Sequence, residues 1–363
     1  MTIVTKTING IQYLYYQDAE NGKIVTTEIG RADLAGDKML EVRFSTLMKH
    51  LSKLLIERGI KTSPYHFEHE PTATIFKDVN AFETIRAGYQ AIKTNIRDDE
   101  LEDLERILFV KYVHGTTAIE GNTFTEEETA KLLFEELTTE NKTVDETLEI
   151  ANYRDVKRFL QTDRGDVTES LIKGVHRLLM KGIKGRNRRP IKAGEYRRTP
   201  VTVGGMELTP PPPESVPEHM RLMLREYHDN IEKRIHPMEV ASIFHLSLEQ
   251  IHPFEDGNGR VGREILNYML AQNGYPLIYV TPKQRSQYLK ALEEGDKGNI
   301  TAILDFVLDR VTATMLYLQT RTHIFDEIKS DEYRKVFVDM AGEEAYNTYI
   351  GLLTAQKNAG ELP

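Results

Sequence analysis

One segment of the chain, residues 251–263, brings together residue types that could transfer a phosphorus-containing group. It reads Ile251-His252-Pro253-Phe254-Glu255-Asp256-Gly257-Asn258-Gly259-Arg260-Val261-Gly262-Arg263. The imidazole of a histidine has an ordinary pKa near neutrality, so His252 suits a base that removes a proton from a hydroxyl as it attacks phosphorus. Phe254 is expected to anchor the loop in the core. The segment therefore predicts a catalytic loop with His252 as the base.

The glycines of this segment predict a cradle for phosphate. Glycine tolerates positive φ and lets the backbone approach a ligand closely, and the exposed N–H groups at a helix N-terminus favour anions. Gly257-Asn258-Gly259 lies between a helix expected over 237–251 and a second helix expected over 260–273. A Gly-Asn-Gly-Arg turn taken alone is more often a loop than a nucleotide site, so this interpretation depends on the residues around it.

Three charged side chains flank the glycines and fit the same ligand. Arg260 and Arg263 are three residues apart and share one face of the first helical turn, where both can fork onto phosphate oxygens. Cations oppose the helix dipole at that end, which indicates an anionic ligand that offsets them. Asp256 precedes the glycines and suits Mg²⁺, a hard cation that binds through one or two carboxylates plus substrate phosphates.

Helical patterns dominate the elements that would position this loop. Beyond residue 75, apolar residues recur at helical spacing, and Gly, Pro and Asn separate the patterns. They predict helices over residues 80–95, 99–119, 126–136, 144–162, 168–181, 215–233, 237–251, 260–273, 284–294, 299–320 and 330–358. The predicted fold class is therefore mainly α, with an all-α core.

Hairpin signals occur at two places in the chain. Near the N-terminus, residues 11–16 and 24–27 flank an Asn-Gly turn and predict a β-hairpin, which an amphipathic helix over 38–58 follows. Residues 200–209 predict a second hairpin, and a run of prolines over 210–213 would stiffen its exit. A hairpin inside an all-α core invites a functional interpretation.

The composition indicates a folded protein and limits its chemistry. The chain has 363 residues, 40% hydrophobic and 28% charged, with a formal net charge of −9 and no cysteine. That charge disfavours a dedicated nucleic-acid binder, and the absence of cysteine excludes thiolate ligands, Cys nucleophiles and disulfides. Because neither a signal sequence nor an apolar run of membrane-spanning length is evident, we expect a soluble, cytoplasmic protein without a membrane partner.

The 252–263 segment resembles the signature of the Fic family, His-x-Phe-x-(Asp or Glu)-Gly-Asn-Gly-Arg-x-x-Arg, and matches every fixed position. The resemblance implies an all-α Fic core that acts as an adenylyltransferase, placing AMP from Mg·ATP on a Ser, Thr or Tyr hydroxyl of a target protein. We expect an α+β accessory module over 1–75, the Fic catalytic domain over 76–310 and a helical extension over 311–363.

The resemblance also implies a role for each position of the signature. The histidine is the base, the acidic residue holds Mg²⁺, the Gly-Asn-Gly amides bind the α- and β-phosphates, and the two arginines bind the phosphate tail. In this chain these residues are His252, Asp256, Gly257, Asn258, Gly259, Arg260 and Arg263. The second hairpin resembles the family's flap, which holds an extended target segment by main-chain pairing. Its candidate residues are Val201, Thr202, Val203, Gly204, Gly205, Met206 and Leu208.

A second motif, Thr116-Thr117-Ala118-Ile119-Glu120-Gly121-Asn122, resembles the family's inhibitory motif, Ser/Thr-x-x-x-Glu-Gly/Asn. Thr116 and Glu120 share a helix face, and Gly121 fits a left-handed cap that ends the helix. The charge of Glu120 opposes the dipole at a helix C-terminus, so a compensating cation is expected. The resemblance implies that Glu120 pairs with Arg263, denies the γ-phosphate its place and holds the isolated protein in a low-activity state.

Other functions are compatible with the same residues. The site could remove AMP from a modified protein by hydrolysis, with Glu120 orienting water, or it could transfer a different phosphate-containing group. The chain could also be a nucleotide-gated protein-binding module, although pure binding would not require a base at His252. A zinc hydrolase is a further rival because His245, Glu249 and His252 share a helical stripe, but no third histidine is convincingly placed.

Several residues near the site also have a purely structural interpretation. His176 and His245 lie in apolar helical patterns and are expected to be core or supporting residues. Tyr288 could stack on adenine, although an aromatic residue at helical spacing is usually core. A basic cluster ahead of the second hairpin is expected to be a solvated loop; it comprises Arg186, Arg188, Arg189, Lys192, Arg197 and Arg198.

The partners that these interpretations imply are ATP and a target protein with a hydroxyl side chain. The sequence leaves open whether the protein modifies itself or forms a homodimer, and whether AMP is added or removed. It also leaves open the identity of the target and what relieves inhibition.

Overall fold

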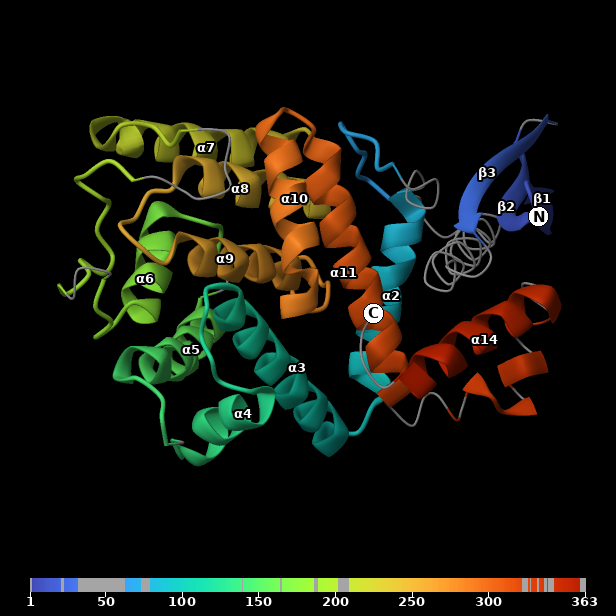
Figure 1. Cartoon of the computed structure of the whole chain (residues 1–363), viewed down its shortest axis with the longest axis horizontal. Coiled ribbons are helices and arrows are strands. Elements are labelled where there is room, and N and C mark those ends of the chain that lie inside the picture. The colour runs from blue at the N-terminus through green and yellow to red at the C-terminus, as the bar shows by residue number, and fades with distance from the viewer. Residues whose placement is uncertain are drawn as a thin grey trace. The chain divides into compact units, whose positions relative to one another are not determined.

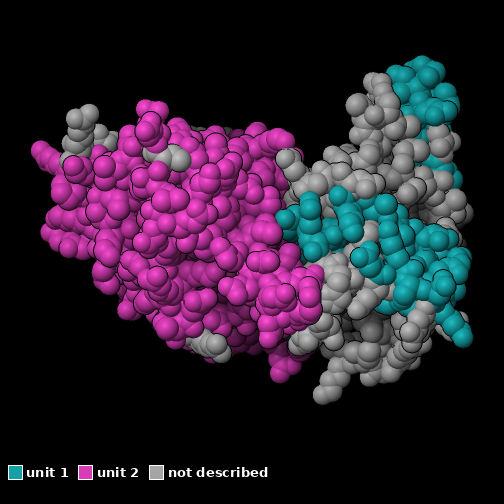
Figure 2. All heavy atoms as spheres, turned by 90° about the horizontal axis from the view of Figure 1, so that it is seen from below, with its two compact units in different colours: residues 1–63, 73–88, 316–363 teal, residues 64–72, 89–315 magenta. Residues whose placement is uncertain are grey.

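A computed structural model describes residues 2–20, 23–31, 63–72, 79–138, 140–163, 165–185, 189–201, 209–321, 326, 328–331, 333–335, 338 and 343–359. The chain divides into two compact units (Figure 2): unit 1 comprises residues 1–63, 73–88 and 316–363, and unit 2 comprises residues 64–72 and 89–315. The 252–263 segment and residues 116–122 both belong to unit 2. The module boundaries expected from the sequence stay a prediction.

Unit 1 contains a three-stranded antiparallel sheet in the order β1-β2-β3 (Figure 1). Its strands are β1 (Thr2–Ile8), β2 (Ile11–Glu20) and β3 (Lys23–Arg31). The pairing of β2 with β3 confirms the predicted N-terminal hairpin. The helix predicted over 38–58 lies outside the described residues.

The first strand, β1, is an addition to the elements predicted from the sequence. It pairs with β2 across the turn Asn9-Gly10, whose two residues have φ of +49° and +77°. Positive φ at both central residues is typical of the tight turns that join hairpin strands. The Asn9-Gly10 pair was therefore a readable sequence signal for the hairpin formed by β1 and β2.

The remaining elements are mainly helical, which confirms the predicted fold class (Figure 1). The helices are α2 (Val79–Asn95), α3 (Asp98–Ile119), α4 (Glu126–Glu135), α5 (Val144–Thr162), α6 (Glu169–Leu179), α7 (Val216–Glu232), α8 (Pro237–Ile251), α9 (Asn258–Gln272), α10 (Arg285–Asp296), α11 (Ile300–Arg321) and α14 (Glu343–Ala359), with 3-10 turns at Pro213–Ser215 and Pro282–Gln284. Part of the helix predicted over 330–358 lies outside the described residues. Among the helices described here, none is both long and apolar enough to cross a membrane.

Reciprocal capping fixes the start of α4 and α5. Thr125 caps α4 with Glu128, and Thr143 caps α5 with Glu146, each pair forming a capping box. Glu146 does more than cap its helix, because its Oε1 accepts hydrogen bonds from the Thr123 backbone N–H at 3.1 Å and from the Thr123 hydroxyl at 2.6 Å. The start of α5 thus holds the loop that follows α3.

The helix pair α8 and α9 forms the centre of unit 2. α8 packs against α7 and α9, while α9 also packs against α6 and α3. α8 begins with Pro237 at its first position, as predicted, and α9 is buried along nearly its whole length. At Gly262 the helices approach so closely that an added Cβ would lie 2.4 Å from Glu249 Oε1. This packing fixes both ends of the loop between them.

Glu264 on α9 is a buried carboxylic acid, only 8% exposed. The Tyr112 hydroxyl donates a hydrogen bond to its Oε2 at 2.5 Å. Burial raises the pKa of Glu264 to about 7, and the Tyr112 hydrogen bond opposes only part of that shift. Between the ordinary pKa of 4.5 and about 7, the folded protein therefore keeps a proton that the unfolded chain releases. The free energy of unfolding should fall as the pH rises through this window.

We expect Glu264→Gln to flatten this pH dependence, because an amide keeps the shape of the side chain but does not ionise. Between pH 4.5 and 8, wild type should lose on the order of 3 kcal/mol of stability relative to the variant. Chemical denaturation across this range measures the difference, with Glu127→Gln, at a side chain that is 78% exposed, as the control. Parallel stability curves for wild type and Glu264→Gln would contradict the assignment.

Candidate active site

The end of α8 places His252 at the start of the loop. His252 is the C-cap residue, with φ of +49° and ψ of +60°, and its backbone N–H donates to the Leu248 carbonyl at 3.0 Å. Its Nδ1 lies 3.3 Å from the Glu249 carbonyl, which can only accept, so Nδ1 carries the proton and Nε2 keeps its lone pair. Burial, together with the charge of Arg197, lowers the pKa of His252. The imidazole is therefore neutral at pH 7 and able to accept a proton at Nε2.

The loop after His252 is locked by side chains that point inward. Phe254 is fully buried and stacks on His176, with ring centroids 3.8 Å apart, which confirms its predicted anchoring role. Asn258 Oδ1 accepts from the Phe254 N–H at 2.8 Å, and Asn258 Nδ2 donates to the Phe254 carbonyl at 3.0 Å. The amide side chain of Asn258 thus closes the loop, and what it offers a ligand is its backbone.

His176 supports the same loop from α6. Its Nδ1 accepts from the Gly194 N–H at 2.8 Å, so the proton resides on Nε2, which lies 3.0 Å from the Asp256 carbonyl. Burial lowers the pKa of His176 to about 4, which keeps this tautomer neutral. The supporting role expected from the sequence agrees with these contacts.

The start of α9 has glycine at two positions where a Cβ would crowd neighbouring side chains. Gly257 has φ of +79°, and a Cβ there would lie 2.5 Å from Met180 Sδ. A Cβ on Gly259 would lie 2.7 Å from Glu120 Oε1. The helix begins at Asn258, so the amides of its first turn have no carbonyl partner within the helix. The result is a close-approach, amide-lined helix N-terminus of the kind that binds anions.

Asp256 fits the expected Mg²⁺ ligand. Its side chain is 41% exposed, its Oδ1 accepts from the Gly257 N–H at 2.6 Å, and Arg260 Nη2 lies 3.6 Å from the same oxygen. Among the described residues, no hydrogen bond reaches Asp256 Oδ2. An accessible carboxylate beside a phosphate site suits Mg²⁺, which completes its octahedral shell with phosphate oxygens and water.

Arg263 is buried and held by the end of α3. Its Nε donates to Thr116 Oγ1 at 2.7 Å, and its Nη2 donates to the Thr116 carbonyl at 3.1 Å and to Glu120 Oε1 at 2.7 Å. The structure therefore pairs Glu120 with Arg263, as the resemblance implied, and adds Thr116 to the contact. The contact between Glu120 and Arg263 is observed, whereas its inhibitory role stays a prediction.

The surroundings of Glu120 are strongly cationic. Glu120 caps the C-terminus of α3, and Gly121 follows with φ of +103°, as predicted for a left-handed end to the helix. Burial alone would raise the pKa of Glu120, but the Arg263 ion pair and hydrogen bond, with Arg260 and Arg285 nearby, hold the pKa below its usual value. Glu120 is thus ionised at neutral pH, although its side chain is still 39% exposed.

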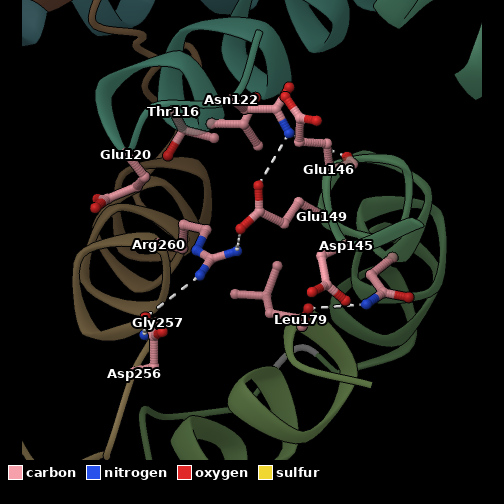
Figure 3. A network of polar contacts seen from close by, with 12 residues as sticks. Thr116, Glu120, Asn122, Asp145, Glu146, Glu149, Leu179, Asp256, Gly257 and Arg260 are labelled. Atoms are coloured by element: carbon pink, nitrogen blue, oxygen red, sulfur yellow. Dashed lines mark hydrogen bonds and ion pairs between the residues drawn. The ribbon is translucent and has the colours of Figure 1, made fainter. Parts of the chain in front are cut away.

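Arg260 is held by a residue that the sequence did not reveal. Its Nη1 donates to Glu149 Oε1 on α5 at 2.9 Å, and Asn122 Nδ2 donates to the other carboxylate oxygen, Oε2, at 2.9 Å (Figure 3). Glu149 precedes Arg260 by 111 residues and has no motif around it. A lone glutamate in an amphipathic helix carries no sequence signal for such a contact.

Arg197 corrects one expectation. The basic cluster was predicted to be a solvated loop, yet Arg197 is only 4% exposed. Its Nε donates to the His252 carbonyl at 2.8 Å, its Nη2 donates to the Pro211 carbonyl at 2.5 Å, and its own N–H donates to the Pro253 carbonyl at 2.9 Å. The carbonyls around the loop need a donor, so this arginine is a structural cross-link. Arg189, Lys192 and Arg198 are exposed, and Arg186 and Arg188 lie outside the described residues.

The zinc-hydrolase hypothesis uses His245 and the adenine-stacking hypothesis uses Tyr288, and these two residues contact each other in the buried core. His245 Nε2 lies 2.8 Å from the Tyr288 hydroxyl, and both side chains are buried. The Tyr288 ring packs against Phe306, with the Arg263 guanidinium 5.7 Å from its centroid. These contacts favour the core interpretation of Tyr288, and the described residues contain no group of three His, Cys, Asp or Glu side chains that could hold a metal ion. Stacking on adenine stays a prediction.

The proposed flap is largely outside the described residues. Of its candidates, the structure describes Val201, whereas Thr202, Val203, Gly204, Gly205, Met206 and Leu208 fall in the segment 202–208 that it does not describe. The flap role stays a prediction. The start of the proline run is fixed by the contact of Pro211 with Arg197.

Comparison with known proteins places this site in a family. The Fic/DOC family model matches residues 166–270. A protein adenylyltransferase Fic from Drosophila ananassae is 31% identical over 214 residues, which cover 58% of this chain and 42% of that protein. The protein of the same name from Drosophila melanogaster is 30% identical over 224 residues, or 61% of this chain and 44% of that protein. This chain thus covers less than half the length of these relatives.

Solved structures share the fold. A Fic-domain signalling protein from Bacteroides thetaiotaomicron has a TM-score of 0.57 at 24% identity, covering 66% of this chain and 95% of that one. A fragment of Fic-1 from C. elegans has a TM-score of 0.57 at 25% identity, covering 65% of this chain and 70% of that one. Unit 2 is thus a helical domain with a histidine beside an amide-lined helix N-terminus. Its residues 166–270 form a Fic domain of the Fic/DOC family.

We expect Arg197→Ala to destabilise the fold, because it leaves buried carbonyls without a donor. The free energy of unfolding should fall by about 2 to 3 kcal/mol. Arg198→Ala, at the next position with a side chain that is 75% exposed, is the matched control and should change it by less than about 0.5 kcal/mol. Urea denaturation of the three proteins measures both effects, and equal losses would contradict the assigned cross-link.

Proposed function

We propose that this chain transfers AMP from Mg·ATP to a Ser, Thr or Tyr hydroxyl of a protein. One observation carries the proposal: a neutral imidazole, His252, lies at the end of α8, and the amide-lined N-terminus of α9 follows within the same loop. The matched Fic domain contains this loop, and the relatives named protein adenylyltransferase support the reaction class. A base and an anion site in one loop fit the attack of a hydroxyl on a phosphoanhydride.

The reaction moves one proton and exchanges one bond at phosphorus. The target hydroxyl oxygen attacks the α-phosphorus of ATP, and the bond from the α-phosphorus to the oxygen that bridges to the β-phosphorus breaks. AMP becomes esterified to the side chain and pyrophosphate leaves. The hydroxyl proton passes to His252 Nε2, because the Glu249 carbonyl keeps the Nδ1 proton in place. The lowered pKa of His252 leaves it ready to accept that proton at neutral pH.

The other residues of the loop bind the triphosphate. Backbone amides of Asn258 and Gly259 face the α- and β-phosphates, where the helix dipole also favours negative charge, and the Gly257 N–H joins them when it releases Asp256 Oδ1. Arg260 and Arg263 bind the terminal phosphates, and Asp256 holds Mg²⁺. A bound Mg²⁺ neutralises part of the phosphate charge.

The proposal includes autoinhibition by Glu120. Its carboxylate lies 2.7 Å from Arg263 Nη2, and the Arg263 Nε is already committed to Thr116. A γ-phosphate and the Glu120 carboxylate are both anions, so they compete for the same guanidinium. ATP would therefore bind without its γ-phosphate on Arg263, and its α-phosphorus would be misaligned for attack.

Labelling with ATP tests the reaction and the restraint together. Full-length wild type, Glu120→Gly and Glu120→Gly/His252→Ala are incubated with Mg²⁺ and α-³²P-ATP, alone and with a cell lysate. Glu120→Gly should raise protein-bound label by at least about tenfold, since it frees one charge-assisted contact at Arg263. The double variant should lose the label. Glu127→Gly, which removes an exposed carboxylate on α4, is the control and should behave as wild type.

The position of the label decides between the possible groups. Transfer of AMP predicts no incorporation from γ-³²P-ATP, whereas transfer of a phosphoryl group predicts the reverse. An absence of label in every variant, with intact folding, would contradict adenylyl transfer and favour hydrolysis of AMP or nucleotide-gated binding.

A further inference from the structure

The head group of Arg260 lies between two carboxylates. The residue is 4% exposed, its Nη1 donates to Glu149 Oε1 at 2.9 Å, and its Nη2 lies 3.6 Å from Asp256 Oδ1 (Figure 3). Its Nε is buried and, within the described residues, has no hydrogen-bond partner. Nη1 of the guanidinium is therefore hydrogen-bonded, and Nη2 is only in distant contact with Asp256. Nε has no hydrogen-bond acceptor among the described residues.

Glu149 is itself fixed in place. Its Oε2 accepts from Asn122 Nδ2 at 2.9 Å, and the same Nδ2 donates to the Glu146 carbonyl at 3.0 Å. Asn122 Oδ1 accepts from the Phe124 N–H at 3.0 Å, so the Asn122 amide is oriented at both ends. This chain of hydrogen bonds links α5 to the loop that follows Glu120. It orients the Glu149 carboxylate so that Oε2 faces Asn122 and Oε1 faces Arg260.

We propose that Glu149 is a positioning residue for Arg260: it holds Nη1 so that Nε and Nη2 stay available for nucleotide phosphate, and it keeps Arg260 off Asp256. A buried guanidinium needs an anionic partner, and a carboxylate oxygen on Nη1 supplies it without blocking the donors opposite. This inference rests on the proposed function, because it assigns Arg260 to the triphosphate.

Loss of Glu149 would redirect Arg260. Asp256 would then be the nearest carboxylate, and a small movement would close the gap of 3.6 Å between its Oδ1 and Arg260 Nη2. An ion pair there would occupy both the phosphate-binding arginine and the carboxylate expected to hold Mg²⁺. The consequence is weaker binding of the nucleotide and a higher Mg²⁺ requirement, with the base His252 unaffected.

Nucleotide binding to the full chain tests the inference without turnover. α,β-Methylene-ATP, which cannot lose pyrophosphate, is titrated calorimetrically with Mg²⁺ into Glu120→Gly and into the same protein carrying Glu149→Ala, Glu149→Gln or Asp155→Ala. Glu149→Ala should raise the Kd by about tenfold, the loss expected when a charge-assisted partner is removed. Glu149→Gln keeps one carbonyl acceptor for Nη1 but loses the charge and sets an amide donor against Asn122 Nδ2, so it should raise the Kd by less than Glu149→Ala does. Asp155→Ala removes an ion-paired carboxylate elsewhere on α5 and should leave the Kd unchanged.

Further readouts separate positioning from a general loss of structure. In the labelling reaction, Glu149→Ala should raise the KM for Mg·ATP and the Mg²⁺ concentration at half-maximal rate, with kcat within about twofold of the parent. If Glu149→Ala does not fold, Glu149→Asp carries the test, because it keeps the charge but withdraws it from Nη1. It too should weaken binding.

The outcomes of this experiment are distinct from those of the proposed function. A Kd that is unchanged or lower in folded Glu149→Ala or Glu149→Asp would overturn the inference, since Glu149 would then be neutral or a competitor of phosphate. The proposed function would stand in that case, because the Glu120→Gly parent would still bind and transfer AMP. A parent that neither binds nucleotide nor becomes labelled would overturn both.

Discussion

Two buried arginines at the positive end of a helix are the constraint on which the rest of unit 2 depends. Arg260 and Arg263 lie in the first turns of α9, where the unpaired amides and the helix dipole already favour anions. Both are at most 5% exposed, so water does not compensate their charge. Leaving one such charge without its partner costs about 3 to 5 kcal/mol. Carboxylates from outside α9 compensate these charges: Glu120 pairs with Arg263, and Glu149 pairs with Arg260.

This compensation links the fold to the proposed chemistry. In the proposed function the Glu120 carboxylate occupies the place on Arg263 that the γ-phosphate would use, so the resting protein and the nucleotide complex satisfy this arginine in different ways. Glu120 sits at the end of α3 and is partly exposed, which suits a partner that can be displaced, whereas Glu149 is held by Asn122 and suits a permanent one. The contacts of Glu146 with Thr123 hold the start of α5, the helix that carries Glu149, against the loop that follows Glu120.

Local patterns made the helices and the loop readable from the sequence. Helical periodicity located α3 to α9 to within two residues at each end; α9 begins two residues early, at Asn258 within the predicted turn, and α6 ends two residues early, at Leu179. The 252–263 motif identified the candidate site, because its histidine, glycines and charged residues are close together in the sequence. Through-space contacts outside the two motifs were not readable: Glu149 reaches Arg260 across 111 residues, and Arg197 looked like one more cation in a basic loop although backbone carbonyls enclose it. β1 was missed despite its Asn9-Gly10 turn signal.

The most direct test of the account is where the γ-phosphate lies. The measurement is a crystal structure of the full chain carrying Glu120→Gly, with Mg²⁺ and α,β-methylene-ATP, beside one of wild type with the same ligands. In the variant we expect the γ-phosphate to accept hydrogen bonds from Arg263 where the Glu120 carboxylate lies now, and in wild type we expect it to lie elsewhere. A γ-phosphate bound to Arg263 in wild type, with Glu120 still on its Nη2, would contradict competition for that guanidinium.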